Sequence, residues 1–229
     1  MSTRIHRPAV RPLSREVVDR WAEVPASVAA DLFQGATLID PALRPLRPIG
    51  GGGRRLVGTA VTALCSGADY GAVHHAIAVA VAGDVIVVEC GGRESPAIIG
   101  ELLGGSARLK GVRGVVVNGA VRDTGRLSEW DDFPVFTRHV NPRGPSSMDQ
   151  GVVNEVISFA GARVAPGDVI LGDDDGLVLI PREEAEARLD AALARVSAEH
   201  GWERELMTGR SSVDVFQVPA AQHAGSSER

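Results

Sequence analysis

The chain has 229 residues, of which 44% are hydrophobic and 23% charged, with a formal net charge of −5. This balance is typical of a globular protein. Acidic and basic residues are interspersed, which argues against a nucleic-acid-binding stripe, and no apolar run reaches the roughly 18 residues of a transmembrane helix. The N-terminus lacks the apolar region of a signal peptide. We therefore expect a cytoplasmic protein with neither a membrane nor a nucleic-acid partner.

In chain order, the first elements are two short helices over residues 14–21 and 26–33, the first with Ser14 as its N-cap. The glycine run Gly50–Gly53 is interpreted as a flexible connector, because a phosphate-binding loop would lead into a helix and this run leads into a strand. Strands and helices then alternate. The predicted strands cover residues 56–65, 84–90, 114–119 and 133–140, and the predicted helices cover residues 69–83 and 100–111. This alternation predicts βαβ units with parallel pairing.

The character changes after Pro142. Residues 154–181 are expected to form short strands with tight turns, the last pair being a hairpin around Asp174 and Gly176. Residues 182–207 form a long, charged, amphipathic helix. Without an internal repeat or linker, we predict a single α/β domain over residues 1–219, followed by a disordered tail, 220–229.

The stretch after the strand at Val115–Asn118 carries the candidate chemistry, because it places Arg122 beside Asp123. Open α/β sheets bind ligands beyond the carboxyl ends of their strands. Glu101 follows the end of the preceding strand and opens the next helix, so these three residues are expected to converge on one crevice.

The residue types suit a small anionic substrate. The helix start at Gly100–Leu103 would direct free N–H groups at a carboxylate, and Gly100 would let it approach the backbone closely. Asp123 could hold a hard divalent cation that keeps several waters. Arg122 could hydrogen-bond a carbonyl oxygen that becomes an enolate.

Plainer interpretations exist for this pair and for other polar residues. An Arg–Asp pair after a strand also fits a surface ion pair. The acidic run Asp173–Asp175 suits a hairpin turn better than a metal cluster. Adjacent His74 and His75 point in different directions on a helix, and an N-cap role explains Asp69.

The remaining reactive side chains also have simpler explanations. Cys65 and Cys90 show no disulfide framework and no zinc-finger spacing, and fit small hydrophobic residues near strand ends. Lys110 is the only lysine and sits at a predicted helix end, where a cation is favoured. The scarcity of lysine agrees with a metal-dependent mechanism over a Schiff base.

Glu101, then 20 residues, then Arg122-Asp123 resembles the acidic-X20-Arg-Asp motif of class II pyruvate aldolases in the RraA-like family. Further segments resemble blocks of that family in the same order, together spanning roughly residues 32–181. These segments are LVGTAVTAL (56–64), AGDVIVVE (82–89), GVVVNGAVRD (114–123), FPVFTR (133–138) and VAPGDVILGDDDGLVLIP (164–181).

The resemblance implies a layered β/β/α swivelling domain with mixed sheets, assembled as a homotrimer or homohexamer. It implies that Asp123 ligates Mg²⁺ or Mn²⁺, that Arg122 contacts the substrate's keto oxygen, and that Glu101 lies near the metal's waters, where many aldolases have aspartate. The amides of Gly100, Glu101, Leu102 and Leu103 would hold the pyruvyl carboxylate. A glutamate of a neighbouring subunit would also contribute, with Glu199, Glu203 and Glu205 as candidates.

The implied activity is metal-dependent cleavage of a keto acid, as in the catabolism of aromatic compounds. The expected substrates are 4-hydroxy-4-methyl-2-oxoglutarate or 4-carboxy-4-hydroxy-2-oxoadipate, giving pyruvate and a second keto acid, with oxaloacetate decarboxylation as a side activity. Two alternatives stay open. One is a non-catalytic regulator that binds ribonuclease E, and the other is a different keto-acid lyase or decarboxylase on the same scaffold.

Overall fold

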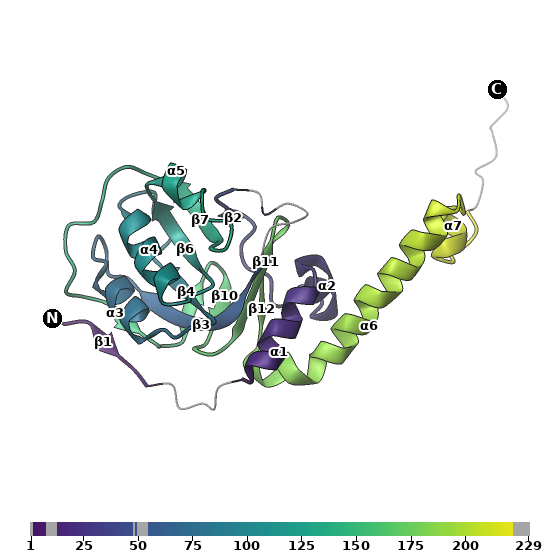
Figure 1. The fold of residues 1–229 in the computed structure, drawn as a ribbon, viewed down its shortest axis with the longest axis horizontal. Helices are drawn as coiled ribbons and strands as arrows, with labels where there is room; N and C mark the ends of the chain where they lie inside the picture. The colour runs from purple at the N-terminus through teal and green to yellow at the C-terminus, as the bar shows by residue number, and fades with distance from the viewer. Residues whose placement is uncertain (1, 8–12, 48, 50–54, 222–229) are drawn as a thin grey trace, which may run out of the picture.

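A computed structural model describes residues 2–7, 13–47, 49 and 55–221. The predicted connector Gly50–Gly53 and most of the predicted tail therefore lie outside the described residues. Figure 1 shows a sheet-based body from which one long helix projects. Within the described ranges, no helix combines the length and the apolar character needed to cross a membrane.

A mixed sheet forms the centre of the body, in the order β1-β8-β3-β4-β6-β7-β2. Four successive strands in this order run parallel to one another: β3 (Leu56–Leu64), β4 (Asp84–Glu89), β6 (Gly114–Val121) and β7 (Val135–Val140). Every residue of β6 is buried, because helices or strands cover both faces, and such strands are expected to be apolar throughout. The predicted βαβ alternation is confirmed.

Antiparallel strands extend this sheet on several sides. The predicted hairpin is formed by β11 (Val169–Asp173) and β12 (Gly176–Ile180), and β11 also pairs with β3. Two more short strands pair antiparallel with this sheet, β2 (Arg44–Pro45) with β7 and β8 (Val152–Val153) with β3. Two others pair in parallel, β1 (Arg4–Ile5) with β8 and β5 (Ala97–Ile99) with β6. Strands β9 (Ile157–Phe159) and β10 (Ala162–Val164) form a separate two-stranded antiparallel sheet. The α/β class with mixed sheet pairing is thus confirmed.

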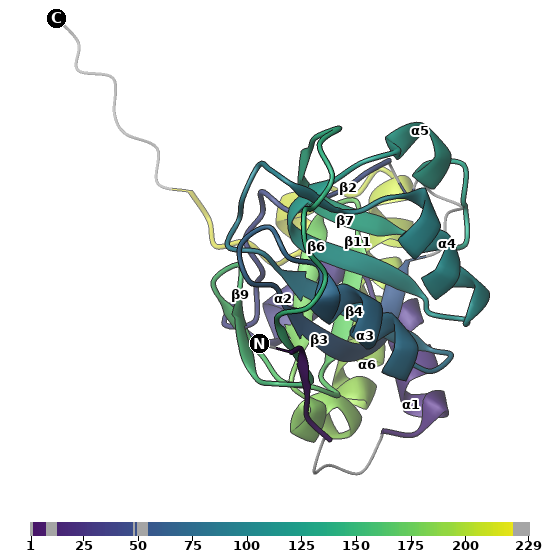
Figure 2. The same ribbon diagram turned by 90° about the vertical axis from the view of Figure 1, so that its left-hand side faces the viewer.

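The helices pack in two groups. Figure 2 shows α3 and α4 together on one side of the sheet, over a core that includes Ile86, Val88 and Val117. The helices α1, α2 and α6 cover a second core built on β11 and β12. Their bounds are α1 (Arg15–Arg20), η1 (Trp21–Glu23), α2 (Ala26–Leu32), α3 (Gly71–Val79), α4 (Glu101–Leu109), α5 (Thr124–Leu127), α6 (Arg182–Met207) and α7 (Ser212–Val215).

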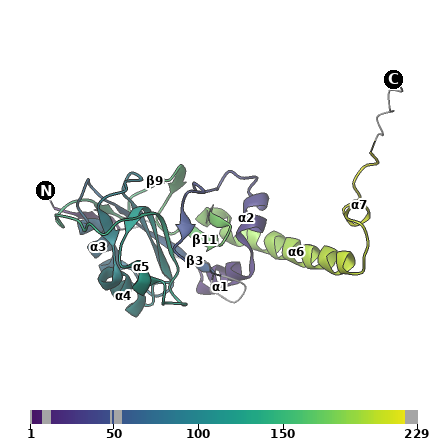
Figure 3. The same cartoon turned by 90° about the horizontal axis from the view of Figure 1, so that it is seen from above.

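Helix α6 is attached only through its first part. Its buried residues are Ala185, Leu189 and Ala192, and beyond them it extends away from the sheet (Figures 1 and 3). At its far end Trp202 stacks edge-on against Phe216, with ring centroids 5.4 Å apart. The predicted helix is confirmed, but its contacts with the second core end at Val196, a little past its middle.

One helix end and one side-chain contact differ from the sequence-based expectation. Helix α3 ends at Val79 instead of residue 83, because Ala80 has the extended ψ of 148°. The side chain of Lys110 donates to the carbonyl oxygens of Ile77 at 2.8 Å and Ala78 at 2.6 Å. The lysine therefore satisfies C-terminal carbonyl groups of α3, not of the helix it follows.

Candidate active site

The predicted strand at Val115–Asn118 is longer than expected, because β6 continues to Val121. Its register with β7 shifts between Val117 and Ala120, so β6 carries one more residue than its partner there. Such a bulge bends a strand and re-aims the side chains that follow it. Arg122 and Asp123 therefore come directly after the strand.

The short strand β5 brings the start of α4 to the same place. Ile99 pairs with Val121, and the N–H of Arg122 donates to the Ile99 carbonyl oxygen at 2.9 Å. Gly100 is the N-cap of α4, and the first bond of the helix runs from the Gly104 N–H to the Gly100 carbonyl at 2.9 Å. The N–H groups of Leu102 and Leu103 precede that bond, so the helix itself does not use them.

Asp123 connects the start of α4 with Arg122. Its Oδ2 accepts the Glu101 N–H at 3.1 Å and lies 3.7 Å from Nε of Arg122. Its backbone is left-handed, with φ 56° and ψ 38°, a conformation that costs about 1 kcal/mol or more outside glycine. The Arg122 and Asp123 side chains are 41% and 40% exposed, so their ion pair contributes little stability.

Two glycines enclose Arg122. A Cβ at Gly100 would lie 2.3 Å from Oδ2 of Asp123 and 2.9 Å from Cγ of Arg122. A Cβ at Gly144 would lie 2.4 Å from Nη1 of Arg122. Sequence reasoning singled out Gly100 but missed Gly144, whose only signal is the turn-like segment NPRGP over residues 141–145.

The acidic side chains of the site are few. Glu101 contacts Asp123 through its backbone N–H, and its own side chain is exposed at the first turn of α4. Among the described residues, no three His, Cys, Asp or Glu side chains gather in a way that could hold a metal. The donor set therefore fits an ion that takes one or two protein carboxylates and fills its shell with water and substrate, as Mg²⁺ does.

The candidate glutamates of α6 do not approach Arg122 within this chain. Glu199 pairs with Arg195 at 3.0 Å, Glu205 pairs with Arg210, and Glu203 is exposed. All three lie on the projecting part of α6, away from α4 and α5 in Figures 1 and 3.

A buried polar network holds the bulge from behind, and sequence reasoning missed it. The Asn118 amide donates to both carboxylate oxygens of Glu89, at 3.0 and 2.9 Å, and accepts from Nε of Arg138 at 2.8 Å. Arg138 continues to Asp40 at 2.6 Å. The Ala42 N–H and Arg138 together hold the pKa of Asp40 below its ordinary value. The sequence contains one indication of this network: the polar residues Glu89 and Asn118 lie in strands that are otherwise apolar.

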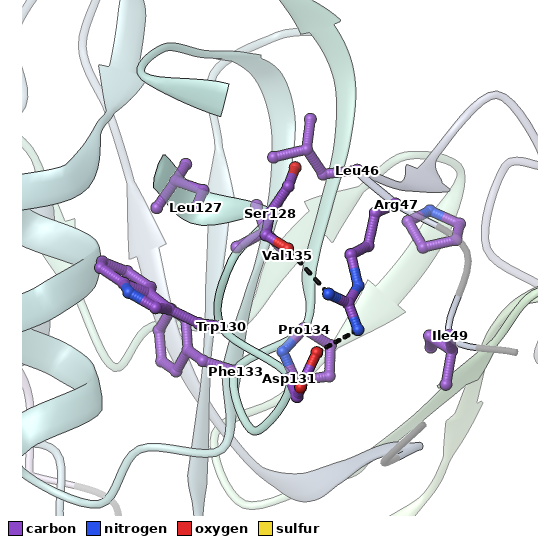
Figure 4. A pocket seen from close by; sticks show the side chains of 11 residues that line it. Leu46, Arg47, Ile49, Leu127, Ser128, Trp130, Asp131, Phe133, Pro134 and Val135 are labelled. Carbon is purple, nitrogen blue, oxygen red and sulfur yellow. Dashed lines mark hydrogen bonds and ion pairs between the residues drawn. The ribbon is translucent and has the colours of Figure 1, made fainter. Parts of the chain in front are cut away.

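Arg47 holds the segment that follows α5 by hydrogen bonds. The Arg47 guanidinium donates to the Ser128 carbonyl oxygen at 2.8 Å and also to Asp131, as Figure 4 shows. The cavity beside these residues measures about 20 Å³, which is room for about one water molecule. This place therefore anchors α5 and is too small for a substrate.

Several plainer interpretations agree with the observed contacts. Asp173 accepts the N–H groups of Ala26 and Asp175, at 2.8 and 3.0 Å, and Asp174 accepts that of Ile49 at 2.6 Å. These carboxylates thus organise the hairpin turn and its neighbours.

The surroundings of Asp69, the two histidines and Cys90 also agree with the plainer interpretations. Asp69 is 2% exposed; burial opposes its charge, but hydrogen bonds from Ser147 and three backbone N–H groups outweigh burial and lower its pKa far below the ordinary value. His75 is exposed, whereas the His74 ring packs 4.6 Å from that of Tyr70. Cys90 is buried, and its neighbour Cys65 together with burial raises the pKa of its thiol.

The helix start of α4 and the Arg122–Asp123 pair lie beyond the carboxyl end of a parallel strand, which is where open α/β sheets generally bind ligands. A family model described as "RraA-like: Aldolase/RraA" matches residues 16–179. The chain belongs to the RraA-like family.

Similar proteins carry different names. A protein of Halalkalibacterium halodurans, provisionally named a 4-hydroxy-4-methyl-2-oxoglutarate aldolase, is 31% identical over 201 residues, covering 88% of this chain and 93% of the relative. Among solved structures, RraAS2 of Streptomyces coelicolor, described as an unusual member of the RNase ES inhibitor RraA family, is 25% identical with a TM-score of 0.74, over 85% of this chain and all of that one. An uncharacterized protein of Pseudomonas syringae shares the fold, with a TM-score of 0.81 at 22% identity over 91% of this chain and 96% of that one.

Proposed function

We propose that this protein is a divalent-metal-dependent pyruvate aldolase, a carbon–carbon lyase acting on 4-hydroxy-4-methyl-2-oxoglutarate or 4-carboxy-4-hydroxy-2-oxoadipate. The observation that carries the proposal is the 3.1 Å hydrogen bond from the Glu101 N–H to Asp123. This bond holds the start of α4 beside the Arg122–Asp123 pair, the arrangement that a site for the carboxylate and keto groups of a keto acid would need. The aldolase name of the relative from H. halodurans supports this substrate class.

The chain's own groups suit the pyruvyl half of the substrate. The N–H groups of Leu102 and Leu103 receive the carboxylate, because a helix start favours negative charge and leaves these donors unused. Gly100 keeps the approach open. Arg122 directs its guanidinium at the 2-keto oxygen, where negative charge develops.

Asp123 would hold the metal, with Mg²⁺ or Mn²⁺ as the expected ions. The bound cation would supply positive charge that polarises the keto group. Glu101, at the first turn of α4, would hold the water that accepts the proton of the C4 hydroxyl.

Cleavage then follows from these placements. Loss of the C4 hydroxyl proton forms a carbonyl at C4, the C3–C4 bond breaks, and its electron pair moves to the keto oxygen as a pyruvate enolate. Arg122 stabilises this oxygen by hydrogen bonding, and protonation at C3 gives pyruvate. Decarboxylation of oxaloacetate forms the same enolate, so we expect it as a side activity.

The open position of the pair favours an assembled enzyme. With two side chains about 40% exposed, the electrostatic contacts are screened in a single chain. A homotrimer or homohexamer, in which Glu199, Glu203 or Glu205 of a neighbouring copy approaches this surface, would exclude water from it. The expected compartment is the cytoplasm.

The test is pyruvate release from both substrates and from oxaloacetate, with Mg²⁺, with Mn²⁺ and with EDTA. Release should need the metal and be lost in Asp123→Ala, while Asp31→Ala, which removes an exposed carboxylate on α2, should behave as wild type.

The outcomes separate the alternatives. Metal binding without release from any of the three acids would favour another keto-acid lyase or decarboxylase. Neither metal binding nor release would refute the aldolase and favour a non-catalytic regulator of ribonuclease E, the reading that the likeness to RraAS2 supports.

A further inference from the structure

The two cysteines of the chain lie side by side, just past the ends of neighbouring parallel strands. Leu64, the last residue of β3, pairs with Glu89, the last residue of β4. Cys65 and Cys90 are the residues that follow. The Cys65 N–H donates to the Glu89 carbonyl oxygen at 2.9 Å, so the ladder of the sheet continues to these positions. The two backbones are therefore about one strand spacing apart, roughly 4.8 Å.

Both cysteine side chains lie on the same face of the sheet. Side chains two residues apart along a strand share a face. Ala63, two residues before Cys65, belongs to the core beneath α3 and α4, and Cys65 packs against the same core. Val88 and Cys90 are likewise two residues apart, and both belong to that core. The two thiols are thus neighbours, at a backbone spacing within the about 4.4–6.8 Å that a disulfide needs between its Cα atoms.

The two thiols differ in their access to solvent. Cys65 is partly exposed, whereas Cys90 is buried. On its other side Cys90 is closely packed, because a Cβ at Gly119 would lie only 3.3 Å from its Sγ. Its neighbour Cys65 together with burial raises the pKa of the Cys90 thiol, and the charge of Arg93 opposes them. A small oxidant from solvent therefore meets Cys65 first, and Cys90 has the sulfur of Cys65 beside it.

We propose that Cys65 and Cys90 form a reversible redox-modification site, which hydrogen peroxide oxidises to a disulfide. Cys65, as the thiolate, attacks one peroxide oxygen and becomes a sulfenic acid, while the O–O bond breaks and the departing hydroxide takes up the proton that Cys65 lost. The sulfur of Cys90 then attacks that of Cys65. The S–S bond forms, the S–O bond breaks, and the hydroxyl group leaves as water with the Cys90 proton. The two thiols lose two electrons, which the peroxide gains.

The site lies beside the bulge of β6. The Cys90 N–H donates to the Asn118 carbonyl oxygen at 3.2 Å, and the register of β6 with β7 shifts between Val117 and Ala120. The disulfide forms next to this backbone and uses no side chain of the proposed aldolase site, so the proposal does not rest on that activity. Because cytosolic disulfides are usually transient, we expect a reducing dithiol to restore both thiols.

The test is peptide mapping of the full-length, folded protein after treatment with hydrogen peroxide. Free thiols are alkylated, and the chain is cleaved without reductant by a protease that cuts before Asp69 and Asp84, which places the two cysteines in separate peptides. We expect these peptides to be joined through Cys65 and Cys90, and dithiothreitol to separate them. An oxygen adduct on Cys65 with Cys90 still free, a disulfide between two chains, or no oxidation would each overturn the proposal.

Single-cysteine variants test the order of the two steps. Cys90→Ala should accumulate a sulfenic acid on Cys65, which dimedone traps. Cys65→Ser should react with peroxide at least about tenfold more slowly, because its remaining thiol is buried. Equal rates for the two variants would contradict the assignment of Cys65 as the first thiol to react.

Phenylarsine oxide tests the spacing of the two sulfur atoms in wild type without any oxidation, because its arsenic binds two adjacent thiols. It should bind wild type at least about tenfold more tightly than either single variant, and equal binding would refute the pairing. Asp123→Ala should form the disulfide as wild type does, whether or not the aldolase activity is found. A variant at that position that failed to form it would contradict the independence of the two sites.

Discussion

Gly100→Ala tests the proposed site with the smallest possible change. The new Cβ would lie 2.3 Å from Oδ2 of Asp123 and 2.9 Å from Cγ of Arg122. Carbon and oxygen atoms need more than 3 Å, so the carboxylate must move by roughly 1 Å. The backbone at Gly100, φ −139° and ψ −166°, is extended and open to alanine, so the change displaces functional groups without straining the chain.

The expected effect on catalysis is large and that on stability is small. A misplacement of about 1 Å costs about 10²-fold in rate, which corresponds to about 2.7 kcal/mol of transition-state stabilisation. Because both displaced side chains are about 40% exposed, they can swing outward, and we expect the free energy of unfolding to fall by less than about 1 kcal/mol.

The assay compares kcat/KM for metal-dependent pyruvate release with urea unfolding of the same preparations. Gly125→Ala is the matched control, because a Cβ there meets nothing within 4 Å and the residue lies in α5. The reasoning would be refuted if Gly100→Ala kept wild-type activity, or if Gly125→Ala lost as much.

Three further predictions follow from other contacts. In Gly144→Ala the new Cβ would lie 2.4 Å from Nη1 of Arg122, and kcat/KM for oxaloacetate should fall by about tenfold. This loss is smaller than that expected for Gly100→Ala, because only the flexible end of the arginine must move. An unchanged kcat/KM would show that Arg122 does not act from this position. Asn118→Leu removes both hydrogen bonds that the Asn118 amide donates to buried Glu89 and leaves the carboxylate only the N–H groups of Gly91 and Ala160. The free energy of unfolding in urea should fall by about 1–3 kcal/mol, a loss that full stability of the variant would contradict. Asp69→Asn should destabilise the fold at pH 7, measured as the unfolding temperature, and its deficit should shrink below about pH 4. The sign follows because the lowered pKa of Asp69 gives stability above the unfolded-state pKa that is lost as the pH falls; a pH-independent deficit would disagree.

The sequence predicted the arrangement of the parallel strands well, because buried strands leave continuous apolar runs. It also predicted that Glu101, Arg122 and Asp123 share one end of the sheet, which their backbone contacts bear out. Their roles in metal and substrate binding stay predictions. The segment after Asn118 was misjudged, because a glycine inside a bulge looks like a glycine that ends a strand.

Other errors share a physical cause. Strand β5 has only three residues, too few for any periodicity to show. Helix α3 stops at Val79 although its apolar pattern continues, since periodicity does not record where the backbone turns. The network of Glu89, Asn118 and Arg138 depends on neighbours distant in sequence, and only the register of β4, β6 and β7 brings them together.

Because only the first part of α6 packs against the body, amide hydrogen exchange along this helix should report both its local opening and its contacts with other copies of the chain. A helix of 26 residues is about 39 Å long. Its outer turns pack only on the short segment around Phe216 and not on the sheet, so we expect them to open on their own, since isolated helices are marginal in water. Amide hydrogens before Ala192 should then exchange as slowly as the sheet, and those after Val196 far faster. If a second copy covers the outer turns, their exchange should slow as protein concentration rises, so one helix would record both local opening and assembly in the same spectrum.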